Sequence, residues 1–112
     1  MAAGTYNFTL EQGSTFSRQI TVQENGTALN LTGYTARMQM RSTHDSSTIA
    51  LTYTTTIASP ASNGIVNLSA TASQSAAIEE GIYVYDLEIE SSGGEVTRLM
   101  EGQVTVTPEV TR

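Results

Sequence analysis

The sequence predicts an all-β protein that folds as one antiparallel β-sandwich of about seven strands. Apolar and polar residues alternate in short runs, as they do in strands that bury one face, and turn residues separate these runs. Serine and threonine supply 30 of the 112 residues and proline only 2, which favours hydroxyl-covered strands over a proline-rich disordered stalk. The length suits a single domain, residues 1–112.

Two strands and a hairpin are predicted near the N-terminus. The first strand covers residues 5–10. The second covers residues 15–23, where Arg18 shares a face with the apolar residues of the strand. The pair Asn25 and Gly26 then predicts a two-residue type I′ hairpin, because both central residues of that turn adopt positive φ.

Three strands are predicted in the middle of the chain, over residues 34–42, 48–57 and 65–69. In the first of them, alternate residues face the core and solvent. The core set is Tyr34, Ala36, Met38 and Met40, and the solvent set is Thr35, Arg37, Gln39 and Arg41. The two methionines are expected to fill the core rather than to bind a ligand. Residues 48–57 are expected to form one continuous strand.

One stretch lacks the strand pattern. Residues 69–81 are rich in alanine and in hydroxyl residues that can cap a helix, which predicts a short helical turn near residues 71–79. We expect this segment to cross from one sheet to the other. Ile78 would fill the core, and Gly81 would end the helix in a left-handed conformation.

Two further strands are predicted at the C-terminal end. In residues 82–90, the tyrosines, leucine and isoleucine at alternate positions face the core, and the acidic residues face solvent. The last strand covers residues 95–107 and is expected to be broken or bulged at Gly102.

Residues 81–85, with the sequence GIYVY, resemble the start of the sixth strand of immunoglobulin-like domains. In those domains a tyrosine at the preceding corner hydrogen-bonds to upstream backbone, and Tyr83 matches that tyrosine. The disulfide of antibody domains is absent, because the chain has no cysteine. A jelly roll is the alternative, although that fold usually has about eight strands.

The immunoglobulin-like arrangement pairs residues 34–42 with residues 82–90, antiparallel in one sheet. The solvent faces of the two strands would then bring arginines and carboxylates together. The arginines are Arg37 and Arg41, and the carboxylates are Asp86, Glu88 and Glu90. Opposite charges across neighbouring strands favour one register.

Composition excludes several classes of function. A net charge of −6 with no lysine argues against a nucleic-acid or anionic-membrane partner. Without cysteine there is no disulfide scaffold, cysteine-ligated metal or thiol catalysis. No apolar run reaches the ~20 residues of a membrane-spanning helix. The N-terminal MAAG leads directly into patterned sequence, so no secretory signal is expected.

No catalytic, cofactor-binding or metal-binding residue is predicted, and we expect the chain not to be an enzyme. His44, Asp45 and Ser46 have the residue types of a hydrolase triad. Neighbours on one polar loop cannot, however, provide an oriented base, a buried acid and an oxyanion hole together. The carboxylates are expected to form a solvated acidic face, with a weak cation site as the alternative. Tyr6 and Tyr53 are candidate exposed rings for carbohydrate binding.

Five short motifs occur in an order that resembles the immunoglobulin-like N-terminal domain of upper baseplate proteins of tailed bacteriophages. They are FTLEQGSTF at 8–16, LTGYTARMQMR at 31–41, GIYVYDLEI at 81–89, RLMEG at 98–102 and VTVTPEVT at 104–111. The resemblance covers nearly the whole chain. Asn30 stands where the pattern often has aspartate, and the longer baseplate proteins continue past this domain.

This resemblance implies a non-enzymatic structural protein of the tail, baseplate or neck. Such a protein is made in the cytoplasm of the bacterial host and is located in the virion. Its expected partners are other virion structural proteins, with the chain in multiple copies or in a symmetric homo-oligomer. The resemblance implies no cofactor. A capsid decoration protein and a host-surface carbohydrate-binding module are the alternatives.

Overall fold

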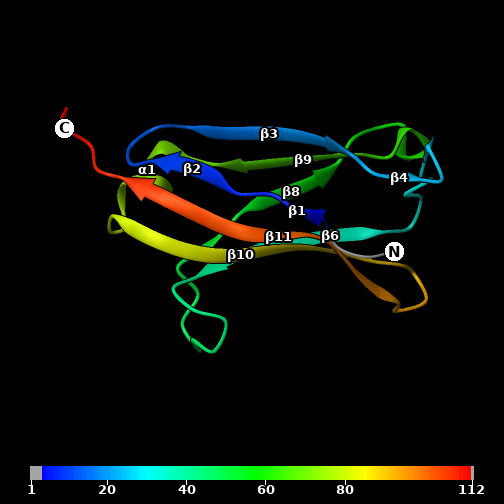
Figure 1. The fold of residues 1–112 in the computed structure, drawn as a ribbon. Helices are drawn as coiled ribbons and strands as arrows, with labels where there is room; N and C mark the ends of the chain where they lie inside the picture. Colours follow the sequence, from blue (N-terminus) through cyan, green and yellow to red (C-terminus); the bar gives the residue numbers. More distant parts are fainter. Residues whose placement is uncertain (1–3, 112) are drawn as a thin grey trace.

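Two β-sheets pack against each other in the computed structural model, which describes residues 4–111 (Figure 1). The larger sheet contains β1 (Gly4–Thr5), β2 (Phe8–Glu11), β6 (Thr35–Arg41), β7 (Leu51–Thr52), β10 (Gly81–Glu90) and β11 (Val96–Thr107). The smaller sheet contains β3 (Phe16–Thr21), β8 (Thr54–Ile57) and β9 (Ile65–Ala70). A separate hairpin joins β4 (Gln23–Glu24) to β5 (Thr27–Ala28). The predicted all-β sandwich is confirmed.

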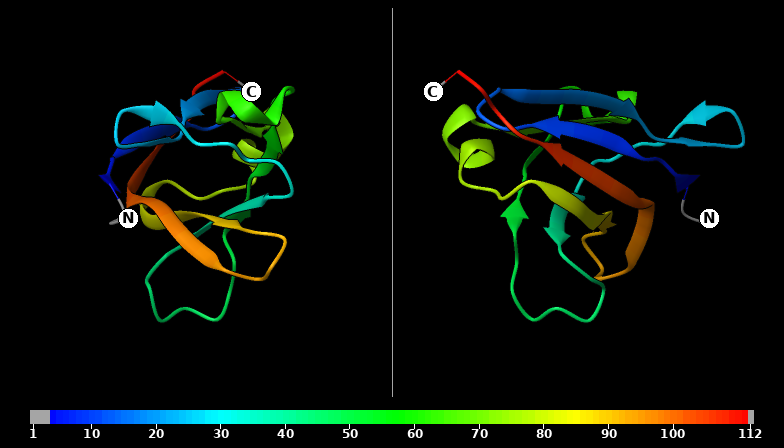
Figure 2. Two further views of the ribbon diagram at one scale, coloured as in Figure 1. Left: turned by 90° about the vertical axis from the view of Figure 1, so that its right-hand side faces the viewer. Right: turned by 60° about the vertical axis from the view of Figure 1, so that its left-hand side comes forward.

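The seven predicted strands are all present in the predicted order. The predicted strand at residues 5–10 is divided into β1 and β2, and the one at residues 48–57 is divided into β7 and β8. In the larger sheet β10 pairs antiparallel with both β6 and β11, and in the smaller sheet β9 pairs antiparallel with both β3 and β8. Figure 2 shows the two layers, with the β4–β5 hairpin at the end opposite the short helix α1 (Ala72–Ala76).

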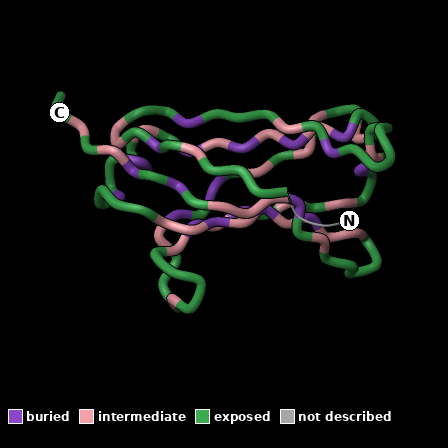
Figure 3. The backbone as a smooth tube through the Cα atoms, in the orientation of Figure 1, coloured by how far each residue is buried: buried purple, intermediate pink, exposed green. Residues whose placement is uncertain are grey.

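The hydrophobic core lies between the two sheets (Figure 3). Met40, Leu87 and Val104 of the larger sheet and Val66 of the smaller sheet are fully buried. Met38 is 1% exposed, so both methionines are core residues as predicted. The alternation read from the sequence therefore assigns the correct faces to the central strands.

The first two strands run parallel to the last one, which corrects the prediction of a purely antiparallel sandwich. β1 and β2 both pair with β11. The register pairs Gly4 with Met100 and Phe8 with Val104. Between them, a Cβ atom on Gly102 would overlap the backbone carbonyl oxygen of Tyr6. Glycine is therefore required where the two backbones approach this closely.

The segment predicted as one strand over residues 48–57 is divided between the two sheets. β7 pairs with β6, whereas β8 pairs with β9. Tyr53 lies between β7 and β8, and its N–H donates to the carbonyl of Met38 at 3.0 Å. Its side chain is buried. The prediction of one continuous strand is wrong because the chain crosses from one sheet to the other at this residue.

The Asn25-Gly26 hairpin is confirmed. Asn25 has φ of 54° and Gly26 has φ of 79°, as the type I′ turn requires. Glu24 pairs with Thr27 on either side of the turn. The hairpin therefore forms for the reason that the sequence suggests.

The helical turn near residues 71–79 is also confirmed, as α1. Thr71 caps it, because its hydroxyl accepts from Gln74 N–H and the Gln74 side chain accepts from Thr71 N–H. Ile78 is buried as predicted. Gly81 does not end the helix: it has φ of 149° and begins β10. Within residues 4–111, no helix is long and apolar enough to cross a bilayer.

The irregularity in β11 lies at Leu99 and not at the predicted Gly102. Leu87 of β10 pairs with Met100 and Glu88 pairs with Arg98, so Leu99 is the extra residue of a β-bulge. Leu99 is buried, and Met100 beside it is partly buried. A bulge lets these two adjacent apolar residues both pack toward the core, whereas a regular strand would expose one of them.

Candidate functional site

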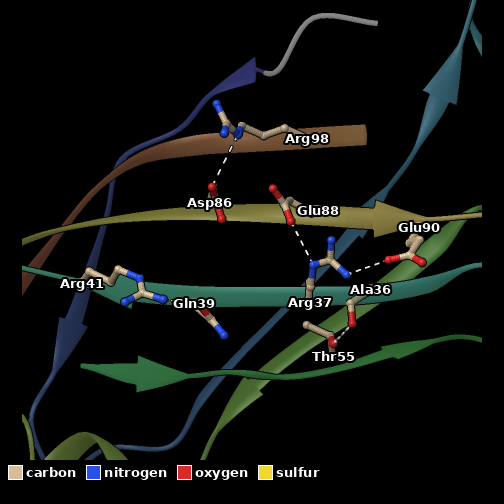
Figure 4. A network of polar contacts seen from close by, with 9 residues as sticks. All are labelled: Ala36, Arg37, Gln39, Arg41, Thr55, Asp86, Glu88, Glu90 and Arg98. Carbon is tan, nitrogen blue, oxygen red and sulfur yellow. Dashed lines mark hydrogen bonds and ion pairs between the residues drawn. The ribbon is translucent and has the colours of Figure 1, made fainter. Parts of the chain in front are cut away.

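The outward face of β6 and β10 carries a network of ion pairs (Figure 4). Arg37 lies directly opposite Glu88 in the antiparallel register, and its Nε donates to Glu88 Oε1 at 2.9 Å. Its Nη1 donates to Glu90 Oε1 at 2.8 Å. The hydrogen bond to Glu90 and, with a smaller effect, the hydrogen bond to Glu88 raise the pKa of Arg37 above its usual value. The predicted placement of Arg37 beside these two carboxylates is confirmed.

Asp86 has a different partner, Arg98 of β11. The Arg98 Nε lies 3.4 Å from Asp86 Oδ2, and its Nη1 lies 3.6 Å from Glu101 Oε1. Residues three apart on a regular strand face opposite sides, so the bulge at Leu99 is what places Arg98 and Glu101 on one face. Burial raises the pKa of Asp86 above its usual value, and Glu88 acts in the same direction. Sequence reasoning missed Arg98, because the predicted break was at another residue.

Arg41 does not pair with a carboxylate among residues 4–111, contrary to the prediction. Its Nη1 donates to the carbonyl of Ser46 at 2.9 Å, and its Nη2 donates to Gln39 Oε1 at 3.1 Å. The neighbour of Arg41 across the strand pair is Val84, and Asp86 lies opposite Gln39. The guanidinium therefore binds the loop that follows its own strand.

A polar depression of about 270 Å³ lies on this face. Arg41, His44, Asp86, Arg98 and Glu101 are among its lining residues, so charged groups of both signs line it. Among the described residues, no group of three or more histidine and carboxylate side chains could hold a metal ion.

The loop between β6 and β7 contains His44, Asp45 and Ser46 and extends away from the sandwich (Figure 1). The Ser46 hydroxyl donates to the carbonyl of Thr48 at 3.2 Å, and the Ser46 carbonyl accepts from Arg41. No hydrogen bond joins His44 to Ser46 or Asp45 in the part of the chain that is described. These three residues lie on one polar loop, and the described hydrogen bonds do not join them as a triad.

The two tyrosines predicted to be exposed differ. Tyr6 is 48% exposed, which confirms the prediction, whereas Tyr53 is 3% exposed and belongs to the core. Tyr53 is buried because the chain crosses between the sheets there. The ring of Tyr6 stacks on Phe8 with centroids 6.1 Å apart. The rings therefore do not form a pair of exposed platforms for a sugar.

A second surface is an apolar groove between β3 and the strands β2 and β11. It has a volume of about 230 Å³. Its apolar lining includes Tyr6, Phe8, Phe16, Ile20, Met38 and Met100. A further depression of about 180 Å³ shares Ile20 and Met100 with it and extends to Val22 and Leu99. The groove therefore runs along most of β3.

Arg18 is the charged residue that lines this groove. Its guanidinium carbon lies 5.0 Å from the centre of the Phe16 ring, within the range of cation–π attraction. Its Nη1 donates to the neighbouring carbonyl of Ser17 at 3.1 Å. None of the described residues that line the groove is acidic. In the sequence, the sign of this groove was the presence of an arginine on the otherwise apolar face of the strand.

The motifs that resemble the baseplate proteins have structural roles in this fold. The Gln12 side chain donates to the carbonyl of Ile78 at 2.6 Å and accepts from the N–H of Glu109 at 3.0 Å. The hydroxyl of Tyr83 donates to the carbonyl of Glu79 at 2.8 Å, as expected for the corner tyrosine. The hydroxyl of Tyr85 donates to the carbonyl of Tyr6 at 2.6 Å. Gln12, Tyr83 and Tyr85 of these motifs thus hold parts of the scaffold together.

No protein-family model matches this sequence, and no curated protein sequence matches it. Among solved structures, the crystal structure of CopC from Methylosinus trichosporium OB3b is similar, with a TM-score of 0.49 and 12% sequence identity. The match covers 100% of this chain and 90% of that chain.

Proposed function

We propose that the chain is a non-enzymatic structural protein of a tailed-bacteriophage particle, in the tail, baseplate or neck, and that it acts by binding other virion proteins. The observation that carries this proposal is the apolar groove beside the outer edge of β3, which has no strand partner within residues 4–111. Such an edge with an apolar groove suits another polypeptide better than a small substrate. The order of the five sequence motifs resembles that of phage baseplate proteins, which supports a phage particle as the source of that polypeptide.

The outward face of β6 and β10, called the polar face below, supports an assembly role rather than catalysis. Two of its arginines are engaged by carboxylates, as in the contacts of Arg37 with Glu88 and of Arg98 with Asp86. A nucleophile hydrogen-bonded to an oriented base is the arrangement that hydrolytic chemistry needs, and the described residues of this face do not provide it.

The proposal includes a location and a set of partners. The chain would be made in the bacterial cytoplasm and would occupy several equivalent positions in the particle, in a symmetric ring. With a net charge of −6, its partners would be proteins rather than nucleic acid or an anionic membrane.

Electron microscopy with gold-labelled antibody on purified particles of the source phage tests this proposal. We expect label at the tail tip or the neck, and peptides of the chain in a digest of the same particles. Label on the head would instead support a capsid decoration protein. No label, together with no peptides in the digest, would contradict a virion role, and titration against host polysaccharide would then test the carbohydrate-binding alternative.

A further inference from the structure

We propose that β3 and its groove bind an extended segment of another protein, which adds a strand beside β3 and places an acidic side chain against Arg18. The inference rests on the proposed function, because it identifies the surface and the partner chemistry through which assembly takes place.

The edge of β3 is free to accept a strand. β3 pairs with β9 along its whole length, from Phe16 opposite Ala70 to Thr21 opposite Ile65. On its other side it has no strand partner among the described residues, since β1 and β2 pair with β11. Alternate residues of an edge strand direct their N–H and C=O groups outward, and an incoming strand can hydrogen-bond to them.

The groove provides space for side chains of the added strand. Every second residue of that strand would point between the sheets, on the same side as Phe16 and Ile20. The floor there consists of Met38, Leu68 and Met100. Apolar side chains would be buried in a depression of about 230 Å³, which continues beyond Ile20 into the second depression.

Arg18 determines the charge of the partner. It lies between Phe16 and Ile20 on the inward side of β3, so its direct neighbour on an added strand would also point inward. The groove has a positive charge and no acidic lining residue among those described. A glutamate or aspartate at the facing position would complement it, flanked two residues away on each side by apolar residues.

A segment of a different protein fits these observations better than a second copy of the chain. Two copies, each with a net charge of −6, repel each other. Pairing of β3 with β3 in the register that centres on Arg18 would also set two arginines directly opposite, which destabilises a strand pair.

Titration of the ¹⁵N-labelled chain with two peptides tests the proposal. The probe peptide SVTETIS presents valine, glutamate and isoleucine on one face when extended, and the control peptide SVTKTIS replaces the glutamate with lysine. We expect amide shifts at millimolar peptide to concentrate in β3 and around Tyr6, Phe8 and Met100. The glutamate peptide should bind about fivefold more tightly than the lysine peptide.

Matched variants separate the role of Arg18 from general electrostatics. Arg18→Gln and Ser17→Glu each change the net charge by the same amount, but Ser17 lies on the outward face of β3. Only Arg18→Gln should abolish the preference for glutamate, and Arg18→Glu should reverse it. The comparison of the two peptides on the unmodified chain stands even if a variant fails to fold.

Several results would overturn the proposal. These are no saturable binding of either peptide, equal binding of both, or shifts confined to the polar face. Self-association of Arg18→Gln without peptide binding would mean that Arg18 protects a bare edge from aggregation, and the proposal would fail. None of these results would contradict a virion role, because gold labelling measures that separately.

Discussion

Arg37 on β6 lies directly opposite Glu88 on β10, and its Nε donates to Glu88 Oε1 over 2.9 Å. A slip of one residue in this strand pair would move Arg37 to the buried face and Met38 to the surface. The ion pair and the buried methionine therefore specify the same register. Contacts on the buried face and on the solvent-exposed face therefore both determine the pairing register of β6 and β10.

The ion pair should contribute to register more than to stability. We expect a double-mutant cycle with Arg37→Met and Glu88→Gln to give a small favourable coupling free energy at low salt, because both groups contact solvent. The coupling should become smaller in about 1 M NaCl, where the Debye length is about 3 Å. Urea unfolding of the four proteins at both salt concentrations measures it. A coupling that does not respond to salt would contradict a solvent-exposed pair.

The hydroxyl of Tyr83 should stabilise the corner before β10. Tyr83→Phe removes the hydrogen bond to the carbonyl of Glu79 and should cost about 0.5–1.5 kcal/mol in the free energy of unfolding. Tyr34→Phe is the matched control, since Tyr34 is also partly buried and the described contacts include no hydrogen bond of its hydroxyl. Equal losses in the two variants, measured by urea unfolding, would contradict this role of Tyr83.

Stability should fall at alkaline pH, and Tyr85 should account for part of the fall. Burial raises the pKa of Tyr85 from 10.0 to about 12, so the folded protein retains its phenolic proton where the unfolded chain loses it. The stabilisation that this difference provides is complete below pH 10 and is lost as the pH rises toward 12. Tyr85→Phe should be less stable at neutral pH, because it loses the bond to Tyr6, and should show a shallower alkaline decline. A decline identical to that of the unmodified chain would contradict this prediction.

Gly102 should be essential for the parallel pairing of the N-terminal strands. Gly102→Ala places a methyl group against the carbonyl oxygen of Tyr6, and we expect a loss of about 1–3 kcal/mol in the free energy of unfolding. Amides of β1 and β2 should exchange faster with solvent in this variant. Gly4→Ala, where the nearest atom lies 3.9 Å from the added Cβ, is the control and should change little.

The sequence was sufficient to predict the features that depend on local pattern. Alternation placed Met38 in the core and Arg37 on the surface, and the Asn25-Gly26 pair determined its own hairpin. The tyrosine motif correctly indicated that the Tyr83 hydroxyl bonds to upstream backbone. Each of these features is fixed by neighbours in the chain or by one amphipathic face.

The features that were missed depend on contacts between distant segments. The alternating pattern continues through Tyr53 although the chain changes sheets there, so periodicity could not show the crossing. The bulge had a local sign, because Leu99 and Met100 are adjacent apolar residues in an alternating strand. The parallel pairing of β1 with β11 had no such local sign in the sequence. Because this pairing takes the N-terminal strands away from β3, the free edge of β3 was not predictable either.

Crosslinking within purified particles tests most directly whether the chain docks through β3. The chain has no cysteine and no lysine, so a cysteine-anchored, amine-reactive crosslinker reports contacts with lysines of other proteins or with an α-amino group. Ser17→Cys places it beside the free edge, and Thr105→Cys places it on the exposed outward face of β11. We predict that the Ser17 position crosslinks to one neighbouring virion protein, next to a segment in which an acidic residue is flanked by apolar ones, and that the Thr105 position gives little product. Equal products from both positions, or products from Thr105 alone, would contradict docking at the edge of β3.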